Sequence, residues 1–212
     1  MCVATRLRLG LPPTEDMPDH CRACDERCDL QLDPWHFLAC RGLTKQSVHR
    51  HTILVSSLCD WANKLGCIVR REPRDLRDGS NDRPDIDIEI GDKRYLVDVT
   101  VRHPCAPSHA ASSSRCSLAA ARAAEKEKNR KYEEMARLQK ATFVPFAVET
   151  FGGMGDCASD FVKQLISEGR KHAYVWAPYE IVYGIQHSVA VAIQRGNAAM
   201  LSVGLHRSRD IV

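Results

Sequence analysis

Three cysteines and one histidine stand close together near the start of the chain. Their spacing is Cys21-x2-Cys24, eleven residues, then His36-x3-Cys40. Three thiolates and an imidazole form the soft donor set that tetrahedral zinc prefers. The pattern therefore predicts a structural Zn²⁺ site, because four protein ligands leave no open position for water. His20 and Cys28 lie in the same stretch and remain alternative ligands, and a group of buried free cysteines is the competing interpretation.

Carboxylates alternate with apolar residues further along the chain, in Pro84-Asp-Ile-Asp-Ile-Glu-Ile90 and Lys93-Arg-Tyr-Leu-Val-Asp-Val-Thr-Val101. The Gly91-Asp92 pair between these segments is typical of a two-residue hairpin turn. In that register Ile90 faces Lys93, so Asp85 lies directly across from Asp98. Strand alternation then places both carboxylates on one face of the hairpin and its isoleucines and valines on the other.

Two opposed carboxylates repel each other unless a cation neutralises them, and oxygen ligands suit hydrated Mg²⁺. Asp98 also stands in an otherwise apolar strand, where a charge requires a partner. The hairpin therefore predicts a cation site at Asp85 and Asp98. Two alternatives stay open. A four-residue turn would pair Asp87 with Asp98 instead, and an acidic strand face is often simply solvated.

A lysine-rich helix is predicted over residues 115–140, which contain no glycine or proline and many good helix formers. On a helical wheel Lys128 and Glu125 align with an apolar line made of Leu118, Ala121, Tyr132 and Met135. We therefore expect Lys128 to point inward, whereas Lys131 lies at the edge of that line and Lys126 faces solvent. A fully solvated helix face with favourable charge pairs is the alternative.

The elements that would position these side chains follow from periodicity and from turn residues. Apolar spacing predicts a helix over 47–65 that ends at Gly66, then a short strand over 67–69 and a basic loop over 70–83. Residues 104–114 resemble a flexible loop. A strand over 142–150 and helices near 156–170 and 179–200 complete the prediction.

Composition excludes several classes of protein. The chain has 212 residues, of which 44% are hydrophobic and 27% charged, so an ordinary folded domain is expected rather than a disordered or fibrous chain. The chain has 30 lysines and arginines and 27 aspartates and glutamates, so its net charge by itself does not indicate nucleic-acid binding. With no long apolar run and no signal-like start, we expect a soluble, non-secreted protein without membrane contact, in which clustered cysteines favour metal over disulfides.

The order of these motifs resembles the PD-(D/E)XK nuclease arrangement, and more closely the C-terminal region of site-specific non-LTR retrotransposon proteins. The resemblance spans roughly residues 5–170. Besides the cysteine cluster, it is carried by Arg50-His51, Glu72-Pro73, Arg83-Pro84-Asp85, Val97-Asp98-Val99-Thr100-Val101, Ala124-Glu125-Lys126-x-Lys128-x2-Lys131-Tyr132 and Phe151-Gly152-Gly153. In that family a zinc knuckle precedes a restriction-like endonuclease that nicks target DNA for target-primed reverse transcription.

The resemblance implies that Asp85 and Asp98 bind the catalytic Mg²⁺ or Mn²⁺, and that Lys128, or else Lys131, is the active-site lysine. Thr100 occupies the position after Asp98 where the basic nuclease pattern has its lysine, which fits a lysine supplied by the helix. Glu149 is a further candidate ligand, although a capping or surface role is the stronger expectation.

We therefore expect an α/β fold with a restriction-endonuclease-like core, in which helices flank a central mixed sheet, and a small N-terminal zinc knuckle. Residues 1–45 would form the lead-in and knuckle. Residues 46–212 would form the nuclease domain, with a core near 46–170 and a helical extension over 171–212. Double-stranded target DNA would be bound through phosphate contacts of four arginines: Arg70, Arg71, Arg74 and Arg77.

The family also implies nuclear location and, as partners, element RNA or a polymerase module in a parent protein. No Tyr/Phe-x-Asp-Asp palm motif occurs in the sequence, so this chain by itself is not expected to copy RNA. Two other functions remain open. One is a catalytically inactive nucleic-acid-binding remnant of the same fold, and the other is a junction or repair nuclease.

Overall fold

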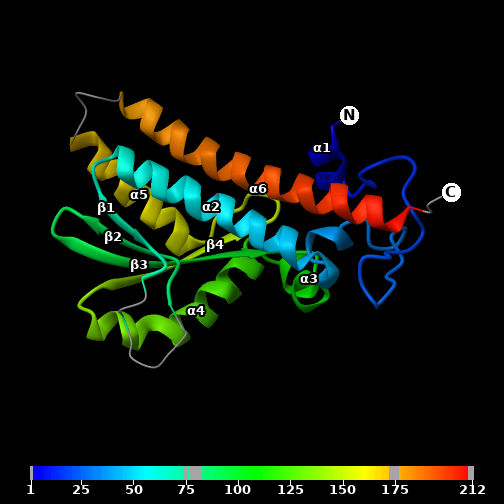
Figure 1. Ribbon diagram of the computed structural model, residues 1–212, viewed down its shortest axis with the longest axis horizontal. Helices are drawn as coiled ribbons and strands as arrows, with labels where there is room; N and C mark the ends of the chain where they lie inside the picture. The colour runs from blue at the N-terminus through cyan, green and yellow to red at the C-terminus, as the bar shows by residue number, and fades with distance from the viewer. Residues whose placement is uncertain (1, 74–75, 77–82, 172–176, 210–212) are drawn as a thin grey trace.

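The computed structural model describes residues 2–73, 76, 83–171 and 177–209 (Figure 1). Within them the elements follow in the order α1 Val3–Arg8, η1 His36–Leu38, η2 Arg41–Leu43, α2 Thr44–Lys64, β1 Ile68–Arg71, β2 Ile86–Ile90, β3 Lys93–Arg102, α3 Pro107–Ser113, α4 Ala119–Leu138, β4 Thr142–Glu149, α5 Asp156–Lys171 and α6 Pro178–Ser208. The result is a mixed α/β fold around one sheet.

The sheet has four strands in the order β1-β2-β3-β4. The first three strands pair antiparallel, and β4 pairs parallel to β3, so the sheet is mixed as expected. Ile90 faces Lys93 and Ile86 faces Val97, which confirms the two-residue turn and the hairpin register. Gly91 begins this turn with a φ of 61°, a conformation that glycine adopts without strain.

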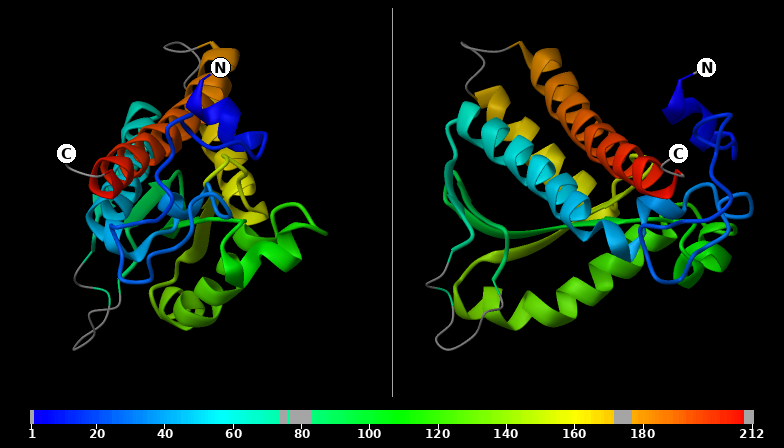
Figure 2. Two further views of the ribbon diagram at one scale, coloured as in Figure 1. Left: turned by 90° about the vertical axis from the view of Figure 1, so that its right-hand side faces the viewer. Right: turned by 45° about the vertical axis from the view of Figure 1, so that its right-hand side comes forward.

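Helices cover both faces of the sheet (Figures 1 and 2). On one face α2, α5 and α6 enclose the main core, which includes Leu54, Ile88, Val97, Phe161 and Ile185. On the other face α4 buries Leu96 of β3 against Tyr132 and Met135. The apolar line predicted for the 115–140 helix therefore does face the sheet.

The N-terminal segment has its own apolar cluster at one end of the fold. Phe37, Leu38 and Leu43 are fully buried there against Met200 and Leu201 of α6. This arrangement matters because a short cysteine-rich segment cannot form a core by itself. The last third of α6 supplies the missing apolar surface, while the first half of α6 belongs to the main core.

Most predicted elements are confirmed, with shifted ends. The loop predicted over 104–114 is wrong, because α3 occupies its second half. Pro107 begins that helix, where the missing N–H costs nothing, and alanine and serine continue it. The long helix begins at Ala119 rather than 115, since Leu118 before it takes a left-handed conformation with φ 61°. No helix in the described part of the chain is long and apolar enough to cross a membrane.

Candidate active site and metal centre

The two predicted carboxylates lie where β3 extends beyond β2. The pairing between the two strands ends at Ile86 and Val97, whereas β3 continues to Arg102 alongside β4. Asp85 stands just before β2, and its Oδ2 accepts a hydrogen bond of 2.6 Å from the backbone N–H of Val99. The Asp85 side chain thus takes the place of a strand partner and is held at the open edge of β3.

Asp98 is buried, with 4% of its surface exposed, and it meets Lys128 of α4. Lys128 Nζ lies 2.8 Å from Asp98 Oδ2, which confirms that this lysine points inward. Burial raises the pKa of the Asp98 carboxyl, and the Asp85 charge adds to this effect, although Lys128 opposes it. Lys128 therefore sets a positive charge against the buried oxygen Oδ2 of Asp98.

His51 of α2 completes this group, and sequence reasoning gave it no role. Its Nε2 lies 3.1 Å from Asp85 Oδ2. In the sequence the Arg50-His51 pair is only part of a motif order, because a half-buried histidine on a helix has no distinguishing spacing. The structure therefore brings together two carboxylates, one lysine and one histidine, which come from α2, β3, α4 and the residue before β2.

The pKa of His51 is expected to lie above its usual value in solution. The hydrogen bond and the negative charge of Asp85 favour the protonated imidazole and outweigh burial, which disfavours it. Replacing Asp85 by Asn removes the charge and should lower the titration midpoint of His51 measured by NMR. Asp87→Asn serves as the matched control and should leave it unchanged. An identical midpoint in wild type and Asp85→Asn would contradict this assignment.

Asp87, the alternative carboxylate, is held by arginines. Arg94 donates to it from Nε at 3.0 Å and from Nη2 at 2.8 Å, and Arg70 forms a further ion pair. Burial alone would raise the pKa of Asp87, but the two guanidinium groups outweigh it and lower the pKa. Since both oxygens of Asp87 are occupied and the hairpin has the two-residue turn, the pairing of Asp87 with Asp98 is wrong.

Two of the remaining candidates lie on the surface. Arg71 is exposed on β1 and Lys131 is exposed on α4, where its Nζ lies 4.9 Å from the centre of the Tyr132 ring. Arg74 and Arg77 lie outside the described residues. Glu149 is buried and accepts the N–H of Ala121 at 3.3 Å in the first turn of α4, so it caps this helix as expected.

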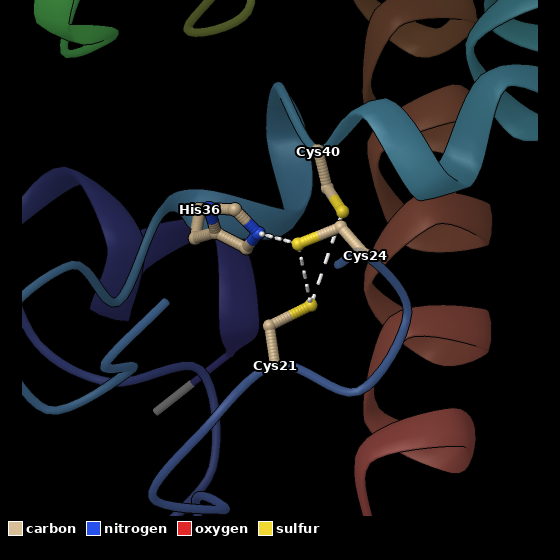
Figure 3. A group of neighbouring side chains, drawn as sticks. All are labelled: Cys21, Cys24, His36 and Cys40. Atoms are coloured by element: carbon tan, nitrogen blue, oxygen red, sulfur yellow. Dashed lines mark hydrogen bonds between the residues drawn. The ribbon is translucent and has the colours of Figure 1, made fainter. Parts of the chain in front are cut away.

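The predicted zinc ligands form one compact group (Figure 3). The ligand atoms of Cys21, Cys24, His36 and Cys40 all lie within 4.8 Å of one another. The Sγ atom of Cys21 lies 3.7 Å from the Sγ of Cys24 and 3.9 Å from the Sγ of Cys40. The Sγ of Cys24 lies 3.4 Å from His36 Nε2. Tetrahedral zinc with Zn–S bonds of about 2.3 Å requires ligand separations of this size. The cluster could therefore bind zinc.

The surroundings of the cluster support this ligand set. Asp33 Oδ2 lies 3.9 Å from His36 Nδ1, on the opposite side of the ring from Cys24, as in sites where a carboxylate orients a metal-binding histidine. Burial raises the pKa of Cys40 to about 12, so a cation is needed to hold it as a thiolate. Neither alternative ligand belongs to the group: Cys28 Sγ faces Glu26 at 3.8 Å, and His20 is exposed.

Comparison with known proteins gives two relatives, while no protein-family model matches the sequence. The chain is 27% identical over 169 residues to the retrotransposable element SLACS 132 kDa protein of Trypanosoma brucei gambiense, which is 76% of this chain and 14% of that protein. It is 35% identical over 103 residues to the retrovirus-related Pol polyprotein from type-1 retrotransposable element R2 of Popillia japonica, which is 46% of this chain and 21% of that protein. The chain is thus similar to short stretches of two retrotransposable-element proteins.

Proposed function

We propose that this chain is a metal-dependent DNA endonuclease with a restriction-like fold, derived from a retrotransposon protein. The observation that carries the proposal is the contact of Lys128 with Asp98 beside Asp85 and His51 at one strand edge. Mg²⁺ or Mn²⁺ held by the two carboxylates would polarise the scissile phosphate and lower the pKa of a bound water. Both relatives are retrotransposable-element proteins, which supports the proposal that the DNA nicked by this chain is the target of such an element.

Each side chain of the site would have a separate role in the hydrolysis of the phosphodiester. The oxygen of a water attacks the phosphorus atom, one P–O ester bond breaks, and the leaving oxygen takes up a proton. Asp85 accepts the Val99 N–H and lies against His51, and these contacts would orient it for metal binding. Lys128 would place its positive charge beside the phosphate and stabilise the charge that develops on its oxygens.

The direct test is the nicking of supercoiled plasmid by zinc-loaded protein with Mg²⁺ or Mn²⁺. We expect relaxed circles from the wild type and none above background from folded Asp85→Ala or Asp98→Ala. If the folded, zinc-loaded wild type gives no relaxed circles with either metal, the endonuclease proposal fails for this chain. The catalytically inactive binding remnant would then explain the same residues. Preferential cutting of branched DNA would favour the junction or repair nuclease.

Lys128 and Lys131 offer a matched pair for the lysine of the site. We expect Lys128→Ala to lower the nicking rate about 100-fold, the effect typical of one group that stabilises transition-state charge. Lys131→Ala removes the same charge from the same helix but lies outside the carboxylate group, so it should change the rate only a few-fold. The rates are compared at saturating DNA. The reverse order would assign the active-site role to Lys131.

We further propose that the chain acts in the nucleus on double-stranded DNA, together with element RNA or a polymerase module of a parent protein. The chain spans only 14% and 21% of the length of the two relatives, which leaves room in such proteins for the partner modules proposed here.

A further inference from the structure

A cavity of about 600 Å³ lies between the cysteine cluster and the end of the sheet. Its walls come from the N-terminal segment, from the beginning of α2, and from the end of β3 with the start of α3. These three segments meet at one end of the molecule (Figure 1). The residues that matter for its chemistry are Asp33, Arg41, Ser47, Arg50, His103 and His109. We call this cavity the knuckle groove.

Arg50 is a buried cation in the wall of the knuckle groove, with 4% of its surface exposed. Its Nη1 donates to the backbone oxygen of Leu38 at 3.2 Å and to Asn197 Oδ1 at 2.9 Å, and both acceptors are neutral. Burial lowers the pKa of Arg50 to about 10, so the group is still charged at neutral pH. Among the described residues no carboxylate pairs with it, and its Nε has no hydrogen-bond partner.

His103 lines the same groove and also keeps one nitrogen unused. Its Nδ1 lies 2.8 Å from Thr150 Oγ1, while Nε2 is buried without a hydrogen-bond partner in the described structure. Burial and the charge of Arg50 lower the pKa of His103 to about 4, which leaves the imidazole neutral. Two buried nitrogens close enough to influence each other are therefore left unsatisfied in one wall, and each such group is costly.

The acids that line the knuckle groove do not compensate Arg50. Asp33 lies beside His36 at 3.9 Å, and Glu26 lies 3.8 Å from Arg41. A buried guanidinium without an anion costs several kcal/mol, and an anionic ligand would offset that cost. The groove is therefore built for a negatively charged group, which Arg50 would hold by charge-assisted hydrogen bonds.

The position of the knuckle groove indicates where that anion comes from. On α2, Ser47 in the groove and His51 at the carboxylates are one helical turn apart. The groove therefore lies one turn of α2 away from the carboxylate group, so a DNA strand bound at the carboxylates would pass it.

We propose that the knuckle groove binds a backbone phosphate of the DNA strand whose cleavage site lies at Asp85 and Asp98. This inference rests on the proposed function and deepens it, because it assigns a second contact to the same substrate, on a phosphate near the reacting one. Arg50 and His103 then position the strand and touch no reacting atom.

The test measures binding separately from cleavage. A short fluorescent DNA duplex is titrated with zinc-loaded protein in buffer without magnesium, and the anisotropy is followed at several salt concentrations. Arg50→Gln should raise Kd about tenfold and lower the slope of log K against log salt by about 0.9, the contribution of one phosphate. Lys163→Gln on α5 likewise removes one positive charge, but from the exposed surface, and is the control, with Kd expected within twofold of wild type.

His103→Phe provides a second variant in case Arg50→Gln does not fold. Phenylalanine retains the ring that packs against Phe151 but removes both nitrogens, and Kd should rise several-fold. A Kd within twofold of wild type in the folded variants, with an unchanged salt slope, overturns the proposal. Nicking is assayed in parallel. Weakened binding without any nicking by wild type would keep the phosphate contact and reject the nuclease, whereas nicking with unchanged binding would do the opposite.

Discussion

Asp98→Asn is expected to abolish metal-dependent nicking while leaving the protein folded and bound to DNA. Asparagine has the shape of aspartate but lacks the charge that binds a divalent cation. Metal activation supplies several kcal/mol of transition-state stabilisation, so its loss should reduce the nicking rate about a thousandfold or more. The rate is measured as conversion of supercoiled plasmid to relaxed circles at saturating protein, next to anisotropy binding in the absence of magnesium.

The fold should survive this change, because the carboxylate of Asp98 gains little from burial. Its pKa is raised, which means that the surroundings disfavour the charged form despite Lys128. A neutral side chain of the same size at this position therefore costs little free energy of unfolding. Thermal unfolding of the zinc-loaded variant checks this point. Full nicking activity by Asp98→Asn would remove the carboxylate pair from the mechanism.

Asp87→Asn is the matched control, since it removes a carboxylate from the same face of the same hairpin. Here the expected effects are reversed. The variant should retain nicking but lose about 3 kcal/mol of stability, because Arg70 and Arg94 are left beside a neutral group. The folded-state pKa of Asp87 is lowered, so its stabilisation is present above pH 4 and disappears as the pH falls further. Urea unfolding of both proteins should therefore differ at pH 7 and converge in acid.

Removing zinc is expected to unfold the N-terminal segment and loosen the end of α6, but to leave the sheet intact. Structural zinc contributes on the order of 10 kcal/mol to small sites that lack a core. The segment shares its apolar cluster with Met200 and Leu201, so these residues lose their cover when the cluster opens. The main core of the sheet shares no residue with the apolar cluster of the N-terminal segment, so it should keep its packing. Hydrogen exchange with and without a chelator measures this pattern directly.

Two cysteines from the same stretch make this prediction specific. Cys24→Ser removes a cluster ligand and should release zinc and remove exchange protection from the segment. Cys28→Ser changes a thiol that faces Glu26, outside the cluster, and should retain one zinc per chain with full protection. Equal loss of zinc from both variants would move Cys28 into the ligand set. Unchanged protection in the zinc-free wild type would show that the metal is not structural.

The local sequence pattern was sufficient to predict the parts of the site that lie within one helix or between two strands adjacent in the chain. The Gly91-Asp92 turn fixes the hairpin register, so it opposes Asp85 and Asp98 before any tertiary contact is known. Helical phase turns Lys128 inward with the apolar line of α4. The cysteine and histidine spacing identified the four side chains that cluster in the structure, because they lie within twenty residues of one another. Periods of two and of 3.6 residues decide which side of an element a residue occupies.

Only the packing of distant elements decided the rest. His51 reaches Asp85 across 34 positions, Asn197 reaches Arg50 across 147, and the end of α6 provides the core of the N-terminal segment. No periodicity encodes these contacts, because it fixes the face that a helix buries but not its height along the sheet. That height depends on how all the side chains of the core fill space together. The sequence therefore determined the four side chains that cluster and the inward lysine, whereas the fold decided what surrounds them.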